Sequence, residues 1–266
     1  MHKVYIALLA LVMLTGCGEY NKVLKSNDYN LKYEYAKKAF EQKKYVQCAT
    51  VLSDIVTIMK GTDKAEETLY LLGLATYENK DYDNSGAYFK TYYTHYPKGK
   101  YTELARFYAG YGYYLSSPEP QLDQTMTIKA IQDLQEFLEY FPKSDKVPIA
   151  QTAIFELQDK LVLKELMNAQ LYYNLGNYMG NNYESAIIVA QNAIKDYPYS
   201  KYKETLEMLI LKSRYQMARQ SVDEKKEDRY REVVDEYYSF ISEYPESDFR
   251  NEADNILKIA KKNIKD

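Results

Sequence analysis

An internal repeat constrains the fold of this chain more than any other feature of its sequence. Four Tyr-Pro or Phe-Pro pairs recur along it, with spacings of 45, 56 and 47 residues between the prolines. Each proline follows a small or β-branched residue by twelve positions, and a tyrosine or threonine stands three positions earlier still. Two offsets that recur in four units predict supersecondary units that stack on their neighbours. The prolines are Pro97, Pro142, Pro198 and Pro245. The residues twelve positions before them are Ser85, Ala130, Ala186 and Val233, and those fifteen positions before them are Tyr82, Thr127, Tyr183 and Tyr230.

Each repeat is expected to form two helices joined by a short turn. In the second repeat, Leu69 and Leu72 have the spacing of one helical face, and a polar turn follows at 79–81. The next helix should begin at Tyr82 and end before Pro97, because proline removes a backbone donor. A serine two residues after three of the prolines is expected to cap the helix that follows. These serines are Ser144, Ser200 and Ser247.

The repeat pattern resembles the tetratricopeptide (TPR) repeat, most closely at Tyr183-Glu184-Ser185-Ala186-Ile187. The expected fold class is therefore all-α: a right-handed superhelical solenoid of about five TPR-like helix pairs with a C-terminal capping helix. The repeats exceed the usual length, and we expect the extra residues in loops at 116–120 and 223–226. The expected divisions are a lipoprotein signal peptide over 1–16, a lipidated linker over 17–31, N-terminal repeats 1–3 over 32–146, and C-terminal repeats 4–5 with the capping helix over 147–266.

The first seventeen residues have the pattern of a bacterial lipoprotein signal. A basic start precedes an apolar run at 4–14, which is too short to span a bilayer. The following Thr15-Gly16-Cys17 resembles the lipobox, whose cysteine is lipidated and becomes the first residue of the mature chain. An ordinary secretory signal with an incidental cysteine is the alternative. Cys48, the other cysteine, takes the small-residue position of an earlier fifth repeat and is expected to be a core residue.

The sequence contains no recognisable catalytic or metal-binding constellation. His95 is the one histidine outside the signal, and it has no cysteine or carboxylate partners at ligand spacing. A nucleophile elbow and a Gly-rich phosphate loop are also missing from the sequence. The net charge of −3 argues against nucleic-acid binding, which normally needs a basic surface. We therefore expect a non-enzymatic protein with no cofactor besides the covalent lipid on Cys17.

Tyrosine is the unusual residue of the composition, with 31 copies and no tryptophan. Its ring fills apolar interfaces while its hydroxyl stays at the edge, which suits helices that stack and also line a wet groove. Stacked helix pairs bind ligands on an extended concave face, to which the first helix of each pair contributes most. Some of these tyrosines should be core residues instead. The candidate ligand-binding tyrosines are Tyr35, Tyr70, Tyr77, Tyr108, Tyr111 and Tyr114.

The lipobox and five repeats together resemble the BamD family of outer-membrane assembly lipoproteins, in its Bacteroidetes-type form. The resemblance rests on Cys17, on 19–26, 45–49 and 122–125, and on the Tyr-Pro-x-Ser turns. It implies a scaffold of the β-barrel assembly machinery that is anchored by lipid at the periplasmic face of the cell outer membrane. It also implies that the N-terminal repeats bind unfolded outer-membrane protein clients, for which the tyrosines named above are the candidate residues. The C-terminal repeats would bind the POTRA region of BamA, and other Bam lipoproteins would be further partners.

Two other classes of envelope lipoprotein remain as alternatives. A TPR-based glycan or nutrient receptor has the same anchor and repeats, but such receptors are usually longer and stack sugars on tryptophan. A coordinator of cell-wall synthesis or division more often carries a coiled coil ahead of its repeats. Residues 18–31 are too short and too polar for a coiled coil.

Overall fold

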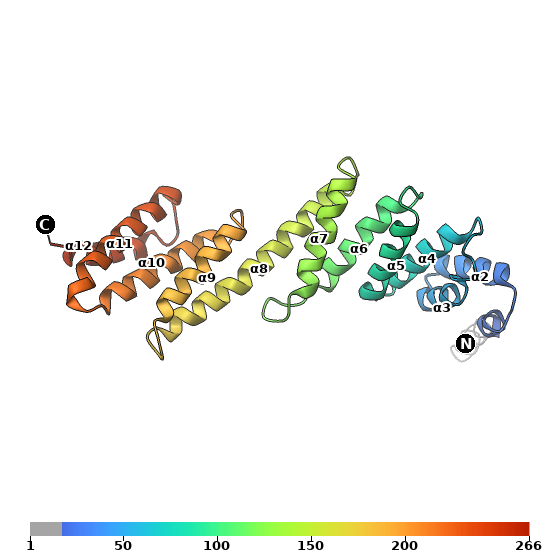
Figure 1. Ribbon diagram of the computed structural model, residues 1–266, viewed down its shortest axis with the longest axis horizontal. Coiled ribbons are helices and arrows are strands. Elements are labelled where there is room, and N and C mark those ends of the chain that lie inside the picture. Colours follow the sequence, from blue (N-terminus) through green and yellow to red (C-terminus); the bar gives the residue numbers. More distant parts are fainter. Residues whose placement is uncertain (1–17, 266) are drawn as a thin grey trace, which may run out of the picture. The chain divides into compact units, whose positions relative to one another are not determined.

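The computed structural model describes residues 18–265, which form helices joined by turns and short loops, with no strand among them (Figure 1). Residues 18–24 form a short helical segment ahead of the named helices. The expected all-α fold of successive helix pairs is therefore confirmed. The helices are α2 (Tyr29–Glu41), α3 (Tyr45–Ile55), α4 (Ala65–Glu78), α5 (Tyr82–His95), α6 (Thr102–Ser116), α7 (Thr125–Tyr140), α8 (Val147–Leu175), α9 (Asn182–Asp196), α10 (Lys203–Arg219), α11 (Asp223–Glu243) and α12 (Arg250–Lys262).

Most helices that follow one another in sequence pack against one another, as expected for a TPR-like solenoid. The chain divides into two compact units. The N-terminal unit contains 18–118 and 125–154, and the C-terminal unit contains 119–124 and 155–265. The boundary between them falls inside α8.

The turn between α4 and α5 shows how the sequence defines a helix pair. The two helices end and begin on either side of 79–81, as expected. Lys80 adopts a left-handed φ of 64°, which reverses the chain. Asp81 then caps α5, because its carboxylate accepts a hydrogen bond from the backbone N–H of Asn84. At its other end, α5 stops before Pro97, also as expected.

The small or β-branched residue of each repeat lies where helices meet. All of these side chains are at most 1 % exposed, and the Ser85 hydroxyl donates a 3.0 Å hydrogen bond to the Gly73 carbonyl. Gly110 allows a further close approach, because a Cβ atom there would lie 2.9 Å from the backbone nitrogen of Leu134. Helices α6 and α7 can thus pack closely only because position 110 has no side chain. The residues at the repeat positions are Cys48, Ser85, Ala130, Ala186 and Val233.

Some expectations about helix boundaries were wrong. Residues 223–226 are the first turn of α11 rather than a loop, because their two leading acidic side chains favour a helix N-terminus. Much of the extra length of the longest repeat lies in α8, which has 29 residues. The serines that follow the repeat prolines were expected to cap the next helix, and this expectation was also wrong. Ser144, Ser200 and Ser247 each accept a hydrogen bond from the amide two residues later, in a turn before the helix begins.

The C-terminal unit is built around two apolar clusters. One joins α8, α9 and α10 and includes Val162, Ile187 and Leu206. The other joins α10, α11 and α12 and includes Phe240 and Ile256. Helix α12 buries its apolar face in the second cluster and exposes its lysines, so it closes the repeats as the expected capping helix.

Candidate ligand-binding surface of the N-terminal unit

Four of the six candidate tyrosines lie in one continuous row on α4 and α6. The rings of Tyr77 and Tyr108 have centroids 4.9 Å apart, and those of Tyr111 and Tyr114 are 5.0 Å apart. Phe107 connects the two pairs, with its ring 5.5 Å from Tyr108 and 5.1 Å from Tyr111. We call Tyr77, Tyr108, Tyr111 and Tyr114 the tyrosine row. The structure thus brings together residues up to 37 positions apart in sequence.

The tyrosine row combines packed rings with available hydroxyl groups. All four side chains are half-buried, and burial raises the pKa of Tyr77 well above its ordinary value. Within residues 18–265, the structure describes no hydrogen-bond partner for the hydroxyls of Tyr77, Tyr108 or Tyr111. Each of these three hydroxyl groups can donate a hydrogen bond to a carbonyl oxygen of a bound chain.

The other two candidates belong to the core. Tyr35 is buried, stacks on Tyr20 with centroids 6.2 Å apart, and donates to the side chain of Gln47. Tyr70 is also buried, and its ring lies parallel to that of Tyr101 at 4.2 Å. Neither ring forms part of the tyrosine row. The expectation that only some of the candidate tyrosines would lie outside the core is therefore confirmed.

An arginine on the same helix holds α6 against its two neighbours. The guanidinium carbon of Arg106 lies 4.2 Å from the ring centroid of Tyr93 on α5 and 3.8 Å from that of Tyr140 on α7. Its Nη1 atom also pairs with Glu136 at 3.4 Å. Burial raises the pKa of Tyr93 to about 12, so its ring remains neutral beside the cation. This contact fixes the helix that carries three members of the tyrosine row.

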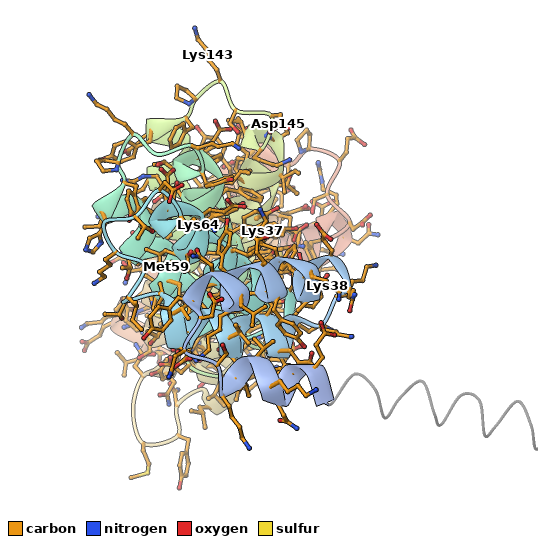
Figure 2. All side chains as sticks on the ribbon, turned by 90° about the vertical axis from the view of Figure 1, so that its right-hand side faces the viewer. Lys37, Lys38, Met59, Lys64, Lys143 and Asp145 are labelled. Carbon is orange, nitrogen blue, oxygen red and sulfur yellow. The ribbon has the colours of Figure 1, made fainter. Side chains whose placement is uncertain are left out.

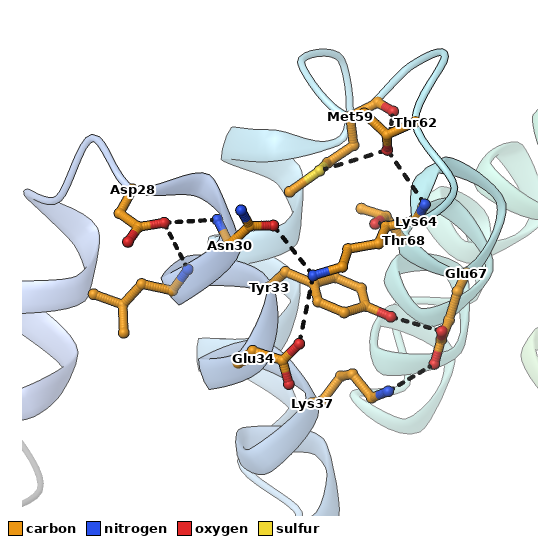
Figure 3. A network of polar contacts seen from close by, with 11 residues as sticks. Asp28, Asn30, Tyr33, Glu34, Lys37, Met59, Thr62, Lys64, Glu67 and Thr68 are labelled. Carbon is orange, nitrogen blue, oxygen red and sulfur yellow. Dashed lines mark hydrogen bonds and ion pairs between the residues drawn. The ribbon is translucent and has the colours of Figure 1, made fainter.

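A polar network joins α2 to α4 at the start of the repeats (Figure 3). The Tyr33 hydroxyl donates a 2.6 Å hydrogen bond to Glu67, whose other oxygen lies 3.2 Å from the Lys37 ammonium. The hydrogen bond from Tyr33 lowers the pKa of Glu67, and the Lys37 contact lowers it further. Lys64 crosses in the opposite direction and pairs with Glu34 at 3.6 Å. Lys37 and Lys64, which are labelled in Figure 2, belong to the N-terminal unit, and their acidic partners give them a structural role.

Sequence reasoning missed a cavity of about 410 Å³ between α4, α5 and the turn that follows α3. Val56, Leu69 and Tyr88 line it, and Lys60 and His95 lie among the polar residues around it. The His95 ring contacts the Thr91 carbonyl at 2.8 Å through Nδ1. The cavity depends on how two helices pack against a turn, and no sequence motif indicates this packing. The one available signal was Lys60, which stands where later repeats have proline.

Three further features named in the sequence can be compared with the described residues: a metal site, the Cys48 thiol and a membrane-spanning helix. No group of three His, Cys, Asp or Glu side chains within 18–265 could hold a metal ion. Cys48 is fully buried, as expected, and burial raises the pKa of its thiol to about 12, so it is unreactive near neutral pH. None of the helices formed by this part of the chain has both the length and the apolar character to cross a bilayer. Cys17, the expected lipidation site, lies outside the described residues.

The chain matches a model of a known protein family. A family model described as YfiO, outer membrane lipoprotein, matches residues 25–181. This range begins just after the first helical segment and ends in the turn before α9, so it covers every member of the tyrosine row. No curated protein matches the chain.

Proposed function

Because this chain belongs to the YfiO family of outer membrane lipoproteins, which is the family of BamD, we propose that it is a non-catalytic scaffold of the β-barrel assembly machinery. In this role it would aid the folding and insertion of outer-membrane proteins by holding clients near BamA. The attachment would be a lipid on Cys17, with the helical repeats at the periplasmic face of the outer membrane. Other Bam lipoproteins would be further partners.

The tyrosine row carries the client-binding part of this proposal. An unfolded β-barrel segment is extended and carries alternating apolar side chains along a backbone with unpaired polar groups. Half-buried rings give such a segment apolar contact. The hydroxyls of Tyr77, Tyr108 and Tyr111, which have no hydrogen-bond partner among residues 18–265, can bind its carbonyl oxygens. A surface of this kind binds a segment without any chemical reaction. A receptor that passes its client onward needs such reversible binding.

Photo-crosslinking tests the client-binding surface. A benzophenone amino acid placed at Tyr111 or Tyr114 should crosslink to a synthetic peptide with the sequence of a C-terminal β-barrel strand. The same label at Tyr178, which is 68 % exposed in the C-terminal unit, is the matched control and should not crosslink. Equal labelling at all three positions, or labelling at Tyr178 alone, would reject the tyrosine row as the client surface.

The scaffold role itself needs a second experiment. We propose that the repeats over 147–266 bind the POTRA region of BamA. Affinity purification of the tagged lipoprotein from mildly solubilised membranes should then yield a POTRA-containing barrel protein in stoichiometric amount. Recovery of a nutrient-uptake barrel or a cell-wall synthase in its place would contradict the assembly function.

A further inference from the structure

A second cavity lies in the C-terminal unit and, unlike the first, has carboxylate side chains among its lining residues. It has a volume of about 320 Å³ and lies beside the turn that joins α9 to α10. Two of its lining residues have exposed aromatic rings: Phe155 is 57 % exposed to solvent and Tyr199 is 89 % exposed. Rings this exposed contribute little to the core of the unit, and together they form a ready apolar contact surface.

Two carboxylate side chains, Asp159 and Asp196, line the cavity together with these rings. The carboxylate of Asp159 already has hydrogen-bond partners inside the protein, because it accepts from the Ser200 hydroxyl at 2.7 Å and from the Lys201 backbone amide at 3.2 Å. Asp196 also lines the cavity and is exposed, and residues 18–265 offer it no described hydrogen bond or ion pair. Lys201 also lines the cavity, and its ammonium group pairs with Asp159 at 3.5 Å. Asp159 and Lys201 therefore balance each other in the turn, while Asp196 lines the cavity without an ion pair from any residue in 18–265.

The charge of the unit favours a cationic ligand. The C-terminal unit has 17 Lys and Arg against 21 Asp and Glu over its described residues, whereas the N-terminal unit has 17 against 16. The residue after each repeat proline is likewise basic in the N-terminal unit and not basic in the C-terminal unit. It is Lys98 and Lys143 in the N-terminal unit, and Tyr199 and Glu246 in the C-terminal unit. Lys143 extends from its turn away from the helices (Figure 2).

We propose that the cavity beside Asp196 binds an arginine side chain presented by a protein partner of the C-terminal unit. A guanidinium group can stack on an aromatic ring and donate two parallel hydrogen bonds to a carboxylate, which matches Tyr199, Phe155 and Asp196 together. The assignment of that partner to the assembly machinery rests on the proposed function, whereas the chemistry of the cavity does not.

The test is a saturation-transfer NMR titration of the full mature lipoprotein in detergent micelles. The probe is the peptide acetyl-Gly-Arg-Gly-amide, and its matched control contains citrulline, which has the shape of arginine without its charge. The arginine peptide should bind saturably and at least about threefold more tightly than the citrulline peptide. Asp196→Asn should remove this difference, and Tyr199→Ala should weaken the binding of both peptides.

Asp145→Asn is the control substitution, because Asp145 is an exposed carboxylate in the corresponding turn of the preceding repeat and does not line the cavity. Binding by this variant should equal that of the unchanged protein. Equal affinity for the two peptides, or full binding by Asp196→Asn, would overturn the proposal. If the arginine peptide binds as expected but no POTRA-containing protein co-purifies, the scaffold function fails while this inference stands.

Discussion

Two glycines on α6 offer a direct test of how the helices of the N-terminal unit pack. A Cβ atom at Gly110 would lie 2.9 Å from both the backbone nitrogen and the Cγ atom of Leu134, whereas one at Gly112 would meet its nearest neighbour, Tyr82, at 3.4 Å. Alanine improves helix propensity at either position by about 1 kcal/mol. Only at Gly110 does the new methyl group press on a backbone atom that cannot rotate away.

The expected stabilities therefore have opposite signs. Gly112→Ala should raise the free energy of unfolding by about 0.5–1 kcal/mol, because it gains propensity and makes an ordinary contact. Gly110→Ala should lower it by about 1–2 kcal/mol, since an overpacking cost of about 2–3 kcal/mol exceeds the same gain. For a chain of this size, the two melting temperatures should differ by roughly 3–12 °C.

The assay is thermal unfolding followed by circular dichroism at 222 nm, with both variants and the unchanged protein measured under identical conditions. Each variant is the control for the other, because both make the same substitution on the same helix two residues apart. Equal melting temperatures, or a higher one for Gly110→Ala, would show that α6 and α7 do not make the close contact described.

Three further predictions concern individual side chains. Arg106→Lys keeps the charge but loses the stacked guanidinium, and should lower the free energy of unfolding by about 1–2 kcal/mol; unchanged melting would mean that the stacking contributes nothing. Hydrogen bonding from Tyr33 lowers the pKa of Glu67, so the stabilisation from this carboxylate is present above its unfolded pKa of about 4.5 and is lost as the pH falls through the lower folded value. Glu67→Gln should accordingly flatten the acid side of the stability profile, and an unaltered profile would contradict that role. Cys48, whose thiol pKa is about 12, should resist a thiol reagent at pH 8 in the folded protein and react once the protein is unfolded in urea; rapid reaction of the folded form would show that the first repeat opens.

The helix pairs could be predicted because each depends on residues close together in sequence. The turn at 79–81, the stop before Pro97 and the buried position of Cys48 all follow from local pattern and repeat spacing. The long helix α8 could not be predicted in this way. Residue spacing reveals that a repeat is longer than its neighbours, but the added residues can extend a helix as readily as a loop.

The division of the tyrosines was harder to predict than the helices. Both Tyr70 and Tyr77 lie on α4, yet the first is buried against Tyr101 and the second belongs to the tyrosine row. A helix inside a stack of repeats packs against neighbours on more than one side, so an apolar face by itself does not identify the side left open. The two cavities were missed for a related reason, since their walls come from elements separated in sequence.

The packing of each helix mainly on those next to it in sequence also affects how the chain reaches its native state. Contacts of this kind close short loops, so little chain entropy is lost before the first favourable contacts form. Small all-helical domains dominated by such local contacts fold on the order of microseconds to milliseconds, and longer chains fold more slowly. A newly exported chain of this type can therefore assemble pair by pair, and each pair that forms becomes the surface on which the next one docks.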